Sequence, residues 1–220
     1  ALDPDRGDKV VVTLAEDDDE VDNEHFQFKG TSLVTKTAFD YDTQPTRILR
    51  VIATDSGGLK TVTDIVINIG NMSEPPTSIS LSSGAVGDVV TVEENAAEDT
   101  LVGSFSTEDP DDADVFSYTL VSGDGDTGNK NFYIAEDGSL KVKASAKLDF
   151  EASPLTSVRI RSTDAGGNFL EAPFAITITN VNELPLSVSL DNDSVMEGLD
   201  VGTIVGELSA TDTDSGDSHT

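Results

Sequence analysis

Two acidic patterns in this sequence combine side chains that can bind a cation, and each returns 109 positions later. The first reads NMSEPP at 71–76 and NVNELP at 180–185. The second reads FDYD at 39–42 and LDFE at 148–151. Recurrence over this distance is typical of tandem structural repeats. Carboxylate and amide oxygens therefore stand at matching places in successive copies.

The placement of these acids favours calcium binding. Each pattern follows a strand-like stretch and ends at turn residues, so its carboxylates are expected at the end of a domain. Two carboxylates about 4 Å apart repel by roughly 4 kcal/mol at an effective dielectric of about 20, and a turn alone does not require such clustering. Ca2+ does, because it takes about six to eight oxygens and tolerates irregular geometry. The alternative is a merely solvated acidic surface.

The charge balance excludes several kinds of partner. The 220 residues include 13 basic and 42 acidic side chains, for a formal net charge of −29. Such a surface repels phosphate backbones and anionic headgroups, so we expect no nucleic-acid partner, and cations are the natural ligands. Apolar residues make up 36% of the chain and alternate with polar ones, which favours a folded domain over disorder.

The residue types give little support to catalysis or membrane insertion. Cysteine and tryptophan are absent, and the two histidines, His25 and His219, stand in an acidic stretch and near the end of the sequence. Paired carboxylates suit a glycosidase, but aromatic residues to line a sugar subsite are few. We predict that the chain is not an enzyme. No apolar run reaches membrane-spanning length.

Short strands separated by Gly and Asp turns fill the middle of the chain. Val158, Ile160 and Ser162 alternate with Arg159 and Arg161, which is the pattern of a half-buried strand. The predicted strands are 78–81, 89–94, 101–107, 115–121, 132–135, 139–143, 157–162 and 174–179. This pattern predicts an all-β, immunoglobulin-like antiparallel Greek-key sandwich. A single lipocalin-like barrel is the rival, but a barrel needs no internal copy.

The repeat divides the chain into three parts. Residues 77–185 form a complete repeat, 1–76 match its later part, and 186–220 match its earlier part, with Glu197 in the place of Glu94. We expect the chain to begin and end inside a repeat. The unpaired strands of its two ends are complementary in kind, which predicts head-to-tail self-association.

One further stretch has a partial calcium-loop pattern. Residues 122–129 read SGDGDTGN and resemble an EF-hand loop, but the glycine stands one place early and no glutamate follows at the last ligand position. We predict a hairpin loop here.

Taken together, the motifs resemble those of cadherin repeats over nearly the whole chain, particularly the cadherin-like repeats of bacterial surface and secreted proteins. VEEN at 92–95 resembles the first-strand glutamate motif, Asp109 and Asp111 the DxD pair, Asp149 and Glu151 the LDRE motif, Asp164 the DAD-type aspartate, and 180–183 the DxNDN linker. The resemblance implies tandem cadherin-like sandwiches with calcium between successive repeats.

Carried over to this chain, the resemblance implies two calcium joints. The first-joint set is Asp40, Asp42, Asn71, Ser73 and Glu74 with Asp109, Asp111 and Asp164. The second-joint set is Glu94, Asp149, Glu151, Asn180, Asn182 and Glu183 with Asp212 and Asp214. Asparagine replaces the first aspartate of both linkers, and Ser73 replaces the middle asparagine. We therefore expect fewer or weaker ions than the family holds.

The predicted function is a calcium-stiffened segment of a bacterial surface or secreted adhesin, extracellular, serving cell adhesion and biofilm formation. The alternative is a calcium-dependent lectin-like module that binds exopolysaccharide, with Phe169, Tyr118 or Tyr133 as sugar platforms. Homophilic adhesion is a further alternative. It is less favoured because the tryptophan that animal cadherins exchange between partners is missing.

Overall fold

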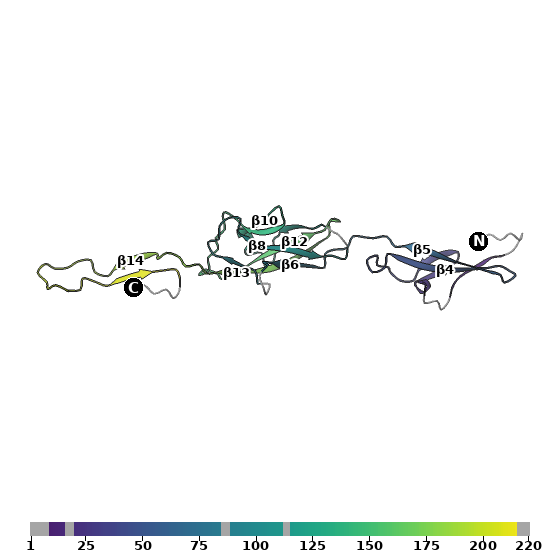
Figure 1. Ribbon diagram of the computed structural model, residues 1–220, viewed down its shortest axis with the longest axis horizontal. Helices are drawn as coiled ribbons and strands as arrows, with labels where there is room; N and C mark the ends of the chain where they lie inside the picture. The colour runs from purple at the N-terminus through teal and green to yellow at the C-terminus, as the bar shows by residue number, and fades with distance from the viewer. Residues whose placement is uncertain (1–8, 16–19, 85–88, 112–114, 215–220) are drawn as a thin grey trace. The chain divides into compact units, whose positions relative to one another are not determined.

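The computed structural model describes residues 9–15, 20–84, 89–111 and 115–214. The chain divides into two compact units, Ala1–Glu74 (unit 1) and Pro75–Thr220 (unit 2), and each is described by itself. Both units are built from strands, as Figure 1 shows. The two 3-10 helices in the described residues have three residues each, and neither could cross a bilayer.

Unit 1 combines a three-stranded sheet with a separate hairpin. Its elements are β1 (Val11–Leu14), η1 (Asn23–His25), β2 (Phe26–Lys29), β3 (Ser32–Thr35), β4 (Thr46–Thr54) and β5 (Lys60–Asn68). The sheet has the antiparallel order β1-β4-β5, and β2 pairs with β3. The Asn23 amide holds η1 to this sheet, because it donates to the Ala15 and Arg50 carbonyls at 2.9 and 2.8 Å.

Unit 2 contains two four-stranded sheets and a further two-stranded pair. Its elements are β6 (Ser78–Ser82), β7 (Thr91–Glu93), β8 (Leu101–Glu108), β9 (Ser117–Leu120), η2 (Asn129–Asn131), β10 (Phe132–Ile134), β11 (Ser139–Val142), β12 (Leu155–Thr163), β13 (Phe169–Thr179), β14 (Ser187–Leu190) and β15 (Leu208–Thr211). The sheet orders are β10-β11-β8-β6 and β7-β13-β12-β9, and β14 pairs with β15.

All eight strands predicted for residues 77–185 are present, in two separate sheets rather than one barrel. The bounds differ most for β13, which begins at Phe169 instead of residue 174. One pairing departs from the predicted antiparallel arrangement. β7 runs parallel to β13, with Thr91 beside Thr177 and Glu93 beside Thr179. Because of this parallel pairing, the end of β7 lies next to the start of the linker that follows β13.

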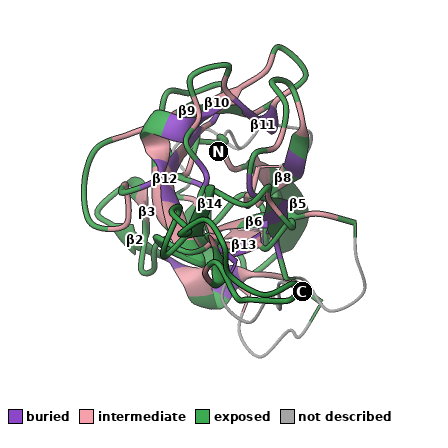
Figure 2. Ribbon diagram, turned by 90° about the vertical axis from the view of Figure 1, so that its left-hand side faces the viewer, coloured by how far each residue is buried: buried purple, intermediate pink, exposed green. Residues whose placement is uncertain are grey.

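The core of unit 2 is made by residues that face inward from both sheets. Phe132, Val158 and Ile160 are fully buried. As predicted, Val158, Ile160 and Ser162 of β12 are buried and share a face, and the Ser162 hydroxyl is satisfied by the Thr107 hydroxyl at 2.8 Å. In Figure 2 buried residues appear on β11 and β12, whereas β14 is exposed along its length.

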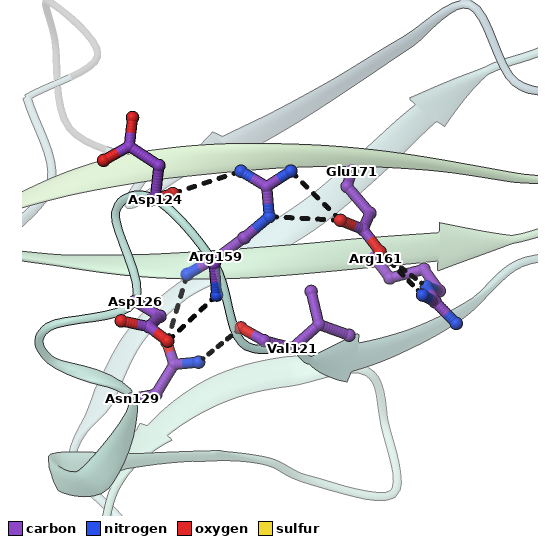
Figure 3. Close-up of polar contacts among 8 residues, drawn as sticks. Val121, Asp124, Asp126, Asn129, Arg159, Arg161 and Glu171 are labelled. Atoms are coloured by element: carbon purple, nitrogen blue, oxygen red, sulfur yellow. Dashed lines mark hydrogen bonds and ion pairs between the residues drawn. The ribbon is translucent and has the colours of Figure 1, made fainter.

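The segment 122–129 is not a hairpin loop, contrary to the prediction. It leaves β9 in one sheet and leads through η2 to β10 in the other. The Asn129 side chain fastens it by donating to the Val121 carbonyl at 2.8 Å and accepting from the Arg159 N–H at 3.0 Å (Figure 3). The Arg159 guanidinium donates to the Asp124 carbonyl at 3.1 Å. The loop therefore binds the positively charged side chain of Arg159.

Glu171 of β13 bridges the two arginines on the outer face of β12 (Figure 3). Its Oε1 accepts from Arg161 Nε and Nη2 at 2.9 and 2.7 Å. Its Oε2 accepts from Arg159 Nε and Nη2 at 3.1 and 3.0 Å. These bonds, with those from Arg161 first, lower the pKa of Glu171 below its ordinary value.

We expect the Glu171→Gln variant to lose less stability in acid than the wild-type chain. A carboxyl whose folded-state pKa is depressed adds stability above its unfolded pKa of about 4.3, and this stability is lost as the pH falls through the folded-state pKa. Urea unfolding followed by circular dichroism at neutral pH and at about pH 3 measures the difference. Glu98→Gln, at an exposed position outside this network, is the control. Equal acid losses in wild type and Glu171→Gln would contradict the expectation.

Candidate metal centre

Glu94 is a buried carboxylate at the end of β7, only 2% exposed. The strand pairing positions it, since its N–H donates to the Thr179 carbonyl at 3.0 Å. Its Oε2 accepts from the Phe150 N–H and its Oε1 from the Val181 N–H, both at 2.8 Å. Glu94 thereby joins β7 to the 148–151 turn and to the linker after β13.

Two more carboxylates meet Glu94 at this end of the sandwich. One oxygen each of Glu94, Glu151 and Glu183 lies within 4.8 Å of the others. Asn180 donates to Glu151 Oε1 at 3.3 Å, and Asn95 donates to Glu183 Oε1 at 2.7 Å. Separate segments thus bring three acidic side chains to one place, as the second-joint prediction requires.

Asp214 extends this cluster from the far side of β15. It is 8% exposed, and its Oδ2 accepts from the Glu183 N–H at 2.7 Å. Its own N–H donates to Asp212 Oδ1 at 3.0 Å. The other Asp214 oxygen is buried with no hydrogen-bond partner in the part of the chain that the structure describes. A buried carboxylate oxygen in this state is suited to a cation.

The surroundings of Glu151 work against its ionisation. Partial desolvation, and then the negative charges of Glu94, Glu183 and Asp214, raise the pKa of Glu151 above its ordinary value. Because the folded-state pKa is raised, this group stabilises the fold below its unfolded pKa, and that contribution is lost as the pH rises through the folded-state pKa. At neutral pH the ionised Glu151 carboxylate therefore contributes unfavourably to the stability of the ion-free chain.

The remaining second-joint residues make local contacts. Asp149 Oδ1 accepts from the Ala152 N–H at 2.8 Å and so closes its own turn. The Asn182 amide donates to the Glu183 carbonyl at 3.0 Å. Neither Asp149 nor Asn182 belongs to the group of three carboxylates, and their role as ligands stays a prediction.

Two side chains that the sequence motifs do not place among the ligands orient Glu183. Asn95 belongs to the VEEN motif and adopts a left-handed backbone with φ 54°. Asparagine tolerates this conformation better than most residues, which was the available signal. Thr213 Oγ1 donates to Glu183 Oε2 at 3.0 Å, and no sequence signal pointed to it.

The unit 1 residues of the first-joint set also come together locally. Asp40 Oδ1 accepts from the Asp42 and Thr43 N–H groups at 3.0 and 3.1 Å, and its bonds from Thr43 lower its pKa. One oxygen of Asp42 lies within 4.8 Å of one of Glu74. Asn71 and Ser73 stand in the same linker as Glu74.

The unit 2 residues of this set make contacts of their own within unit 2. Asp109 Oδ1 accepts from the Asp111 N–H at 3.0 Å. Asp164 is buried, and its two oxygens accept from the backbone and side-chain nitrogens of Asn168 at 2.8 and 2.9 Å. Because the two units are described separately, the complete first-joint set stays a prediction.

Comparison with known proteins finds similarity to protocadherins. No family model matches the sequence. The chain is 27% identical to human (Homo sapiens) Protocadherin Fat 1 over 187 residues, 82% of this chain, and 29% identical to mouse (Mus musculus) Protocadherin Fat 4 over 225 residues, 98% of this chain. The matched region covers 4% of each of these two proteins.

Solved structures show the same fold. The structure described as "Protocadherin Gamma B2 extracellular cadherin domains 3-6" matches with a TM-score of 0.63 at 22% identity, covering 94% of this chain and 49% of that one. A Protocadherin gammaB7 EC3-6 cis-dimer structure also gives 0.63, at 18% identity over 94% and 52% of the two chains. The chain is therefore all-β and cadherin-like: it has the immunoglobulin-like β-sandwich fold of cadherin extracellular domains, and its sequence is similar to those of protocadherins.

Proposed function

We propose that this chain is a calcium-binding, cadherin-like segment of an extracellular adhesin, with calcium stiffening the joints between repeats. The observation that supports it best is the group of carboxylates from Glu94, Glu151 and Glu183. The donors gathered here are oxygens, which suit hard cations and not zinc or copper. Calcium fits better than magnesium, because ligands from separate segments approach irregularly and magnesium demands near-ideal octahedral geometry.

The proposed joint ties the linker to both of its neighbours. Glu94 and Glu151 belong to the complete repeat, Glu183 to the linker, and Asp214 to the segment after β15. Calcium, when bound, supplies the positive charge that offsets repulsion among these acids. The chain's own contribution is to hold the acids in place through the Phe150 and Val181 N–H groups. We assign the repeats as 1–76, 77–185 and 186–220.

By repetition, we assign a second site of the same kind to the first joint. Its ligands are Asp40, Asp42, Asn71, Ser73, Glu74, Asp109, Asp111 and Asp164. Support within unit 1 comes from the approach of Asp42 to Glu74. Asp164 resembles Glu94 in being buried and in accepting hydrogen bonds at both oxygens, here from Asn168.

Calcium is expected to raise the stability of unit 2. Extracellular modules hold calcium with dissociation constants of roughly 0.1 to 1 mM. About 10 mM calcium would then add about 1.4 to 2.7 kcal/mol per ion. Urea unfolding in calcium, in chelator and in magnesium of equal ionic strength tests this. Identical unfolding midpoints in calcium and chelator would count against the function.

Stiffening is a separate part of the proposal and has its own readout. Small-angle scattering of the full chain should give a narrower distribution of maximum dimensions in calcium than in chelator. A calcium-stabilised chain whose scattering is unchanged would retain the binding function but lose the mechanical one.

The finer features of the proposed adhesin rest on the sequence resemblance. These are the bacterial surface location, the biofilm role and binding to exopolysaccharide. The aromatic rings considered as sugar platforms all have partners: Arg161 stands 4.2 Å over the Phe169 ring, Tyr118 lies 5.1 Å from Phe105, and the Tyr133 hydroxyl donates to Asp99. We therefore favour the structural segment over the lectin. Self-association is supported by the cis-dimer described for the gammaB7 relative.

A further inference from the structure

Three hydroxyl groups join the two four-stranded sheets of unit 2. Thr107 Oγ1 of β8 lies 2.8 Å from Ser162 Oγ of β12 and 3.1 Å from the Tyr118 hydroxyl of β9. β8 belongs to one sheet, and β9 and β12 belong to the other. Ser162 is fully buried. This hydroxyl bridge of Thr107, Ser162 and Tyr118 is therefore a polar connection between the sheets inside an otherwise apolar core.

Packing alone does not require hydroxyls at these places. A hydroxyl pair replaced on both sides by apolar groups of similar shape can leave stability nearly unchanged. The chain itself contains the apolar version, because Ala53 of β4 stands 109 positions before Ser162 and Ala210 of β15 stands 103 positions after Thr107. Alanine is thus compatible with both strands, and the hydroxyls of the complete repeat point to a more specific role.

The hydroxyl bridge lies next to two acids of the first-joint set. Asp109 comes two residues after Thr107, and Asp164 comes two residues after Ser162. Side chains two positions apart on a strand share a face and stand about 7 Å apart along it. β8 begins after the turn that follows Glu94, and β12 is antiparallel to β13, which ends at the linker. Both strands therefore run away from the Glu94 cluster and lead from the bridge to the two acids.

The two acids are held in place by their own surroundings. Asp109 Oδ1 accepts from the Asp111 N–H at 3.0 Å, and its Oδ2 is buried with no hydrogen-bond partner among the residues that the structure describes. Asp164 is 6% exposed and accepts from the Asn168 N–H at 2.8 Å. Calcium needs its oxygens about 2.3 to 2.6 Å away. The separation of the two carboxylates therefore affects how well they could share an ion.

We propose that the hydroxyl bridge positions Asp109 and Asp164 for the cation of the first joint. By tying β8 to β12, the bridge fixes the separation of the two acids before an ion arrives. Without it, the ion must first draw the two strands together, and the loss of preorganisation lowers its affinity. This inference rests on the calcium function proposed for the first joint, whereas the effect of the bridge on the ion-free acids does not.

Site-resolved NMR of the full chain can follow the two joints separately during a calcium titration. The Asp111 and Asn168 amides donate to the two acids, so their signals respond to an ion at the first joint. The Phe150 and Val181 amides donate to Glu94, so their signals respond to an ion at the second joint. Each variant thus gives one affinity for each joint.

The test variant is Thr107→Val, which keeps the shape of the side chain and removes its hydroxyl. Calcium affinity at the first joint should fall about threefold to tenfold, the usual effect of losing one hydrogen bond. Affinity at the Glu94 cluster should stay unchanged, whereas a general loss of stability in unit 2 would weaken both. Ser162→Ala should act in the same direction. Thr107→Ser, which keeps the hydroxyl, should restore an affinity close to that of the wild type.

A neighbouring hydroxyl pair provides the matched control. Ser106 precedes Thr107 on β8, and its hydroxyl lies 2.6 Å from that of Ser80 on the exposed face of the same sheet. This pair connects two strands of one sheet and does not reach the other sheet. Ser106→Ala should leave the affinity of both joints unchanged. Equal weakening by Ser106→Ala and Thr107→Val at the first joint would overturn the positioning role.

Hydrogen exchange in chelator separates this inference from the calcium function. In the ion-free Thr107→Val chain, the Asp111 and Asn168 amides should exchange at least about threefold faster than in the wild type, because their acceptors are held less firmly. Faster exchange without any calcium response at these amides would refute the first-joint calcium site and support the bridge. Exchange and first-joint affinity that both match the wild type would overturn the bridge, even if calcium binds at both joints.

Discussion

Replacing Glu94 by glutamine is expected to have the largest effect on calcium binding. Both Glu94 oxygens accept backbone N–H groups, and glutamine would turn an amide donor toward one of them. Leaving a buried donor unsatisfied costs about 1 to 3 kcal/mol of folding stability. The variant also loses one negative charge from the group of three. We expect calcium affinity to fall at least about tenfold, which corresponds to about 1.4 kcal/mol, measured by titration calorimetry.

The neighbouring glutamate provides a matched control for this substitution. Glu93 is the last residue of β7 and directly precedes Glu94, has the same side chain and is exposed. Glu93→Gln should therefore keep both calcium affinity and unfolding midpoint near those of the wild type. If the two variants weaken calcium binding equally, overall negative charge rather than a built site attracts the ion.

Replacing Phe132 by alanine is expected to cause the largest loss of stability. Phe132 is fully buried between the sheets of unit 2. Truncation of a buried phenylalanine costs about 3 to 5 kcal/mol. Amide hydrogen exchange reports each unit separately, so amides of β12 and β13 should exchange about 100- to 1,000-fold faster or more. Amides of β4 and β5 in unit 1 should not change.

An exposed apolar residue shows whether this effect is specific to the core. Val115 is 79% exposed, and Val115→Ala should change the exchange of β12 and β13 by little, as for most surface substitutions. Exchange that stays slow in the Phe132→Ala chain would mean that the two sheets do not depend on this ring for their packing.

The strands of unit 2 could be predicted because each carries its own alternation of buried and exposed residues. The alternation of apolar and charged residues from Val158 to Ser162 indicates one strand, and turn residues mark the ends of such strands. The parallel pairing of β7 with β13 could not be predicted, since it depends on residues far apart in the sequence. The 122–129 loop was misassigned for a related reason. Its Gly and Asp residues signal a turn but not the sheet to which the next strand belongs.

For the candidate site, too, the sequence predicts the residues but not their arrangement in space. The resemblance to cadherin repeats implies Glu94, Glu151 and Glu183 as ligands, and these residues meet because strand pairing and the linker bring their segments together. Asp149 has equally strong sequence support, yet it is engaged by the Ala152 N–H in its own turn. Residue type and spacing thus indicate which carboxylates are available, and strand pairing and the linker determine which of them converge.

Crystals of the full chain grown with calcium provide the most direct measurement of calcium ligation. Anomalous scattering should locate an ion about 2.3 to 2.6 Å from at least one oxygen of each of Glu94, Glu151 and Glu183. A water molecule at that place, or three carboxylates turned away from one another in calcium-saturated crystals, would contradict calcium ligation at this joint.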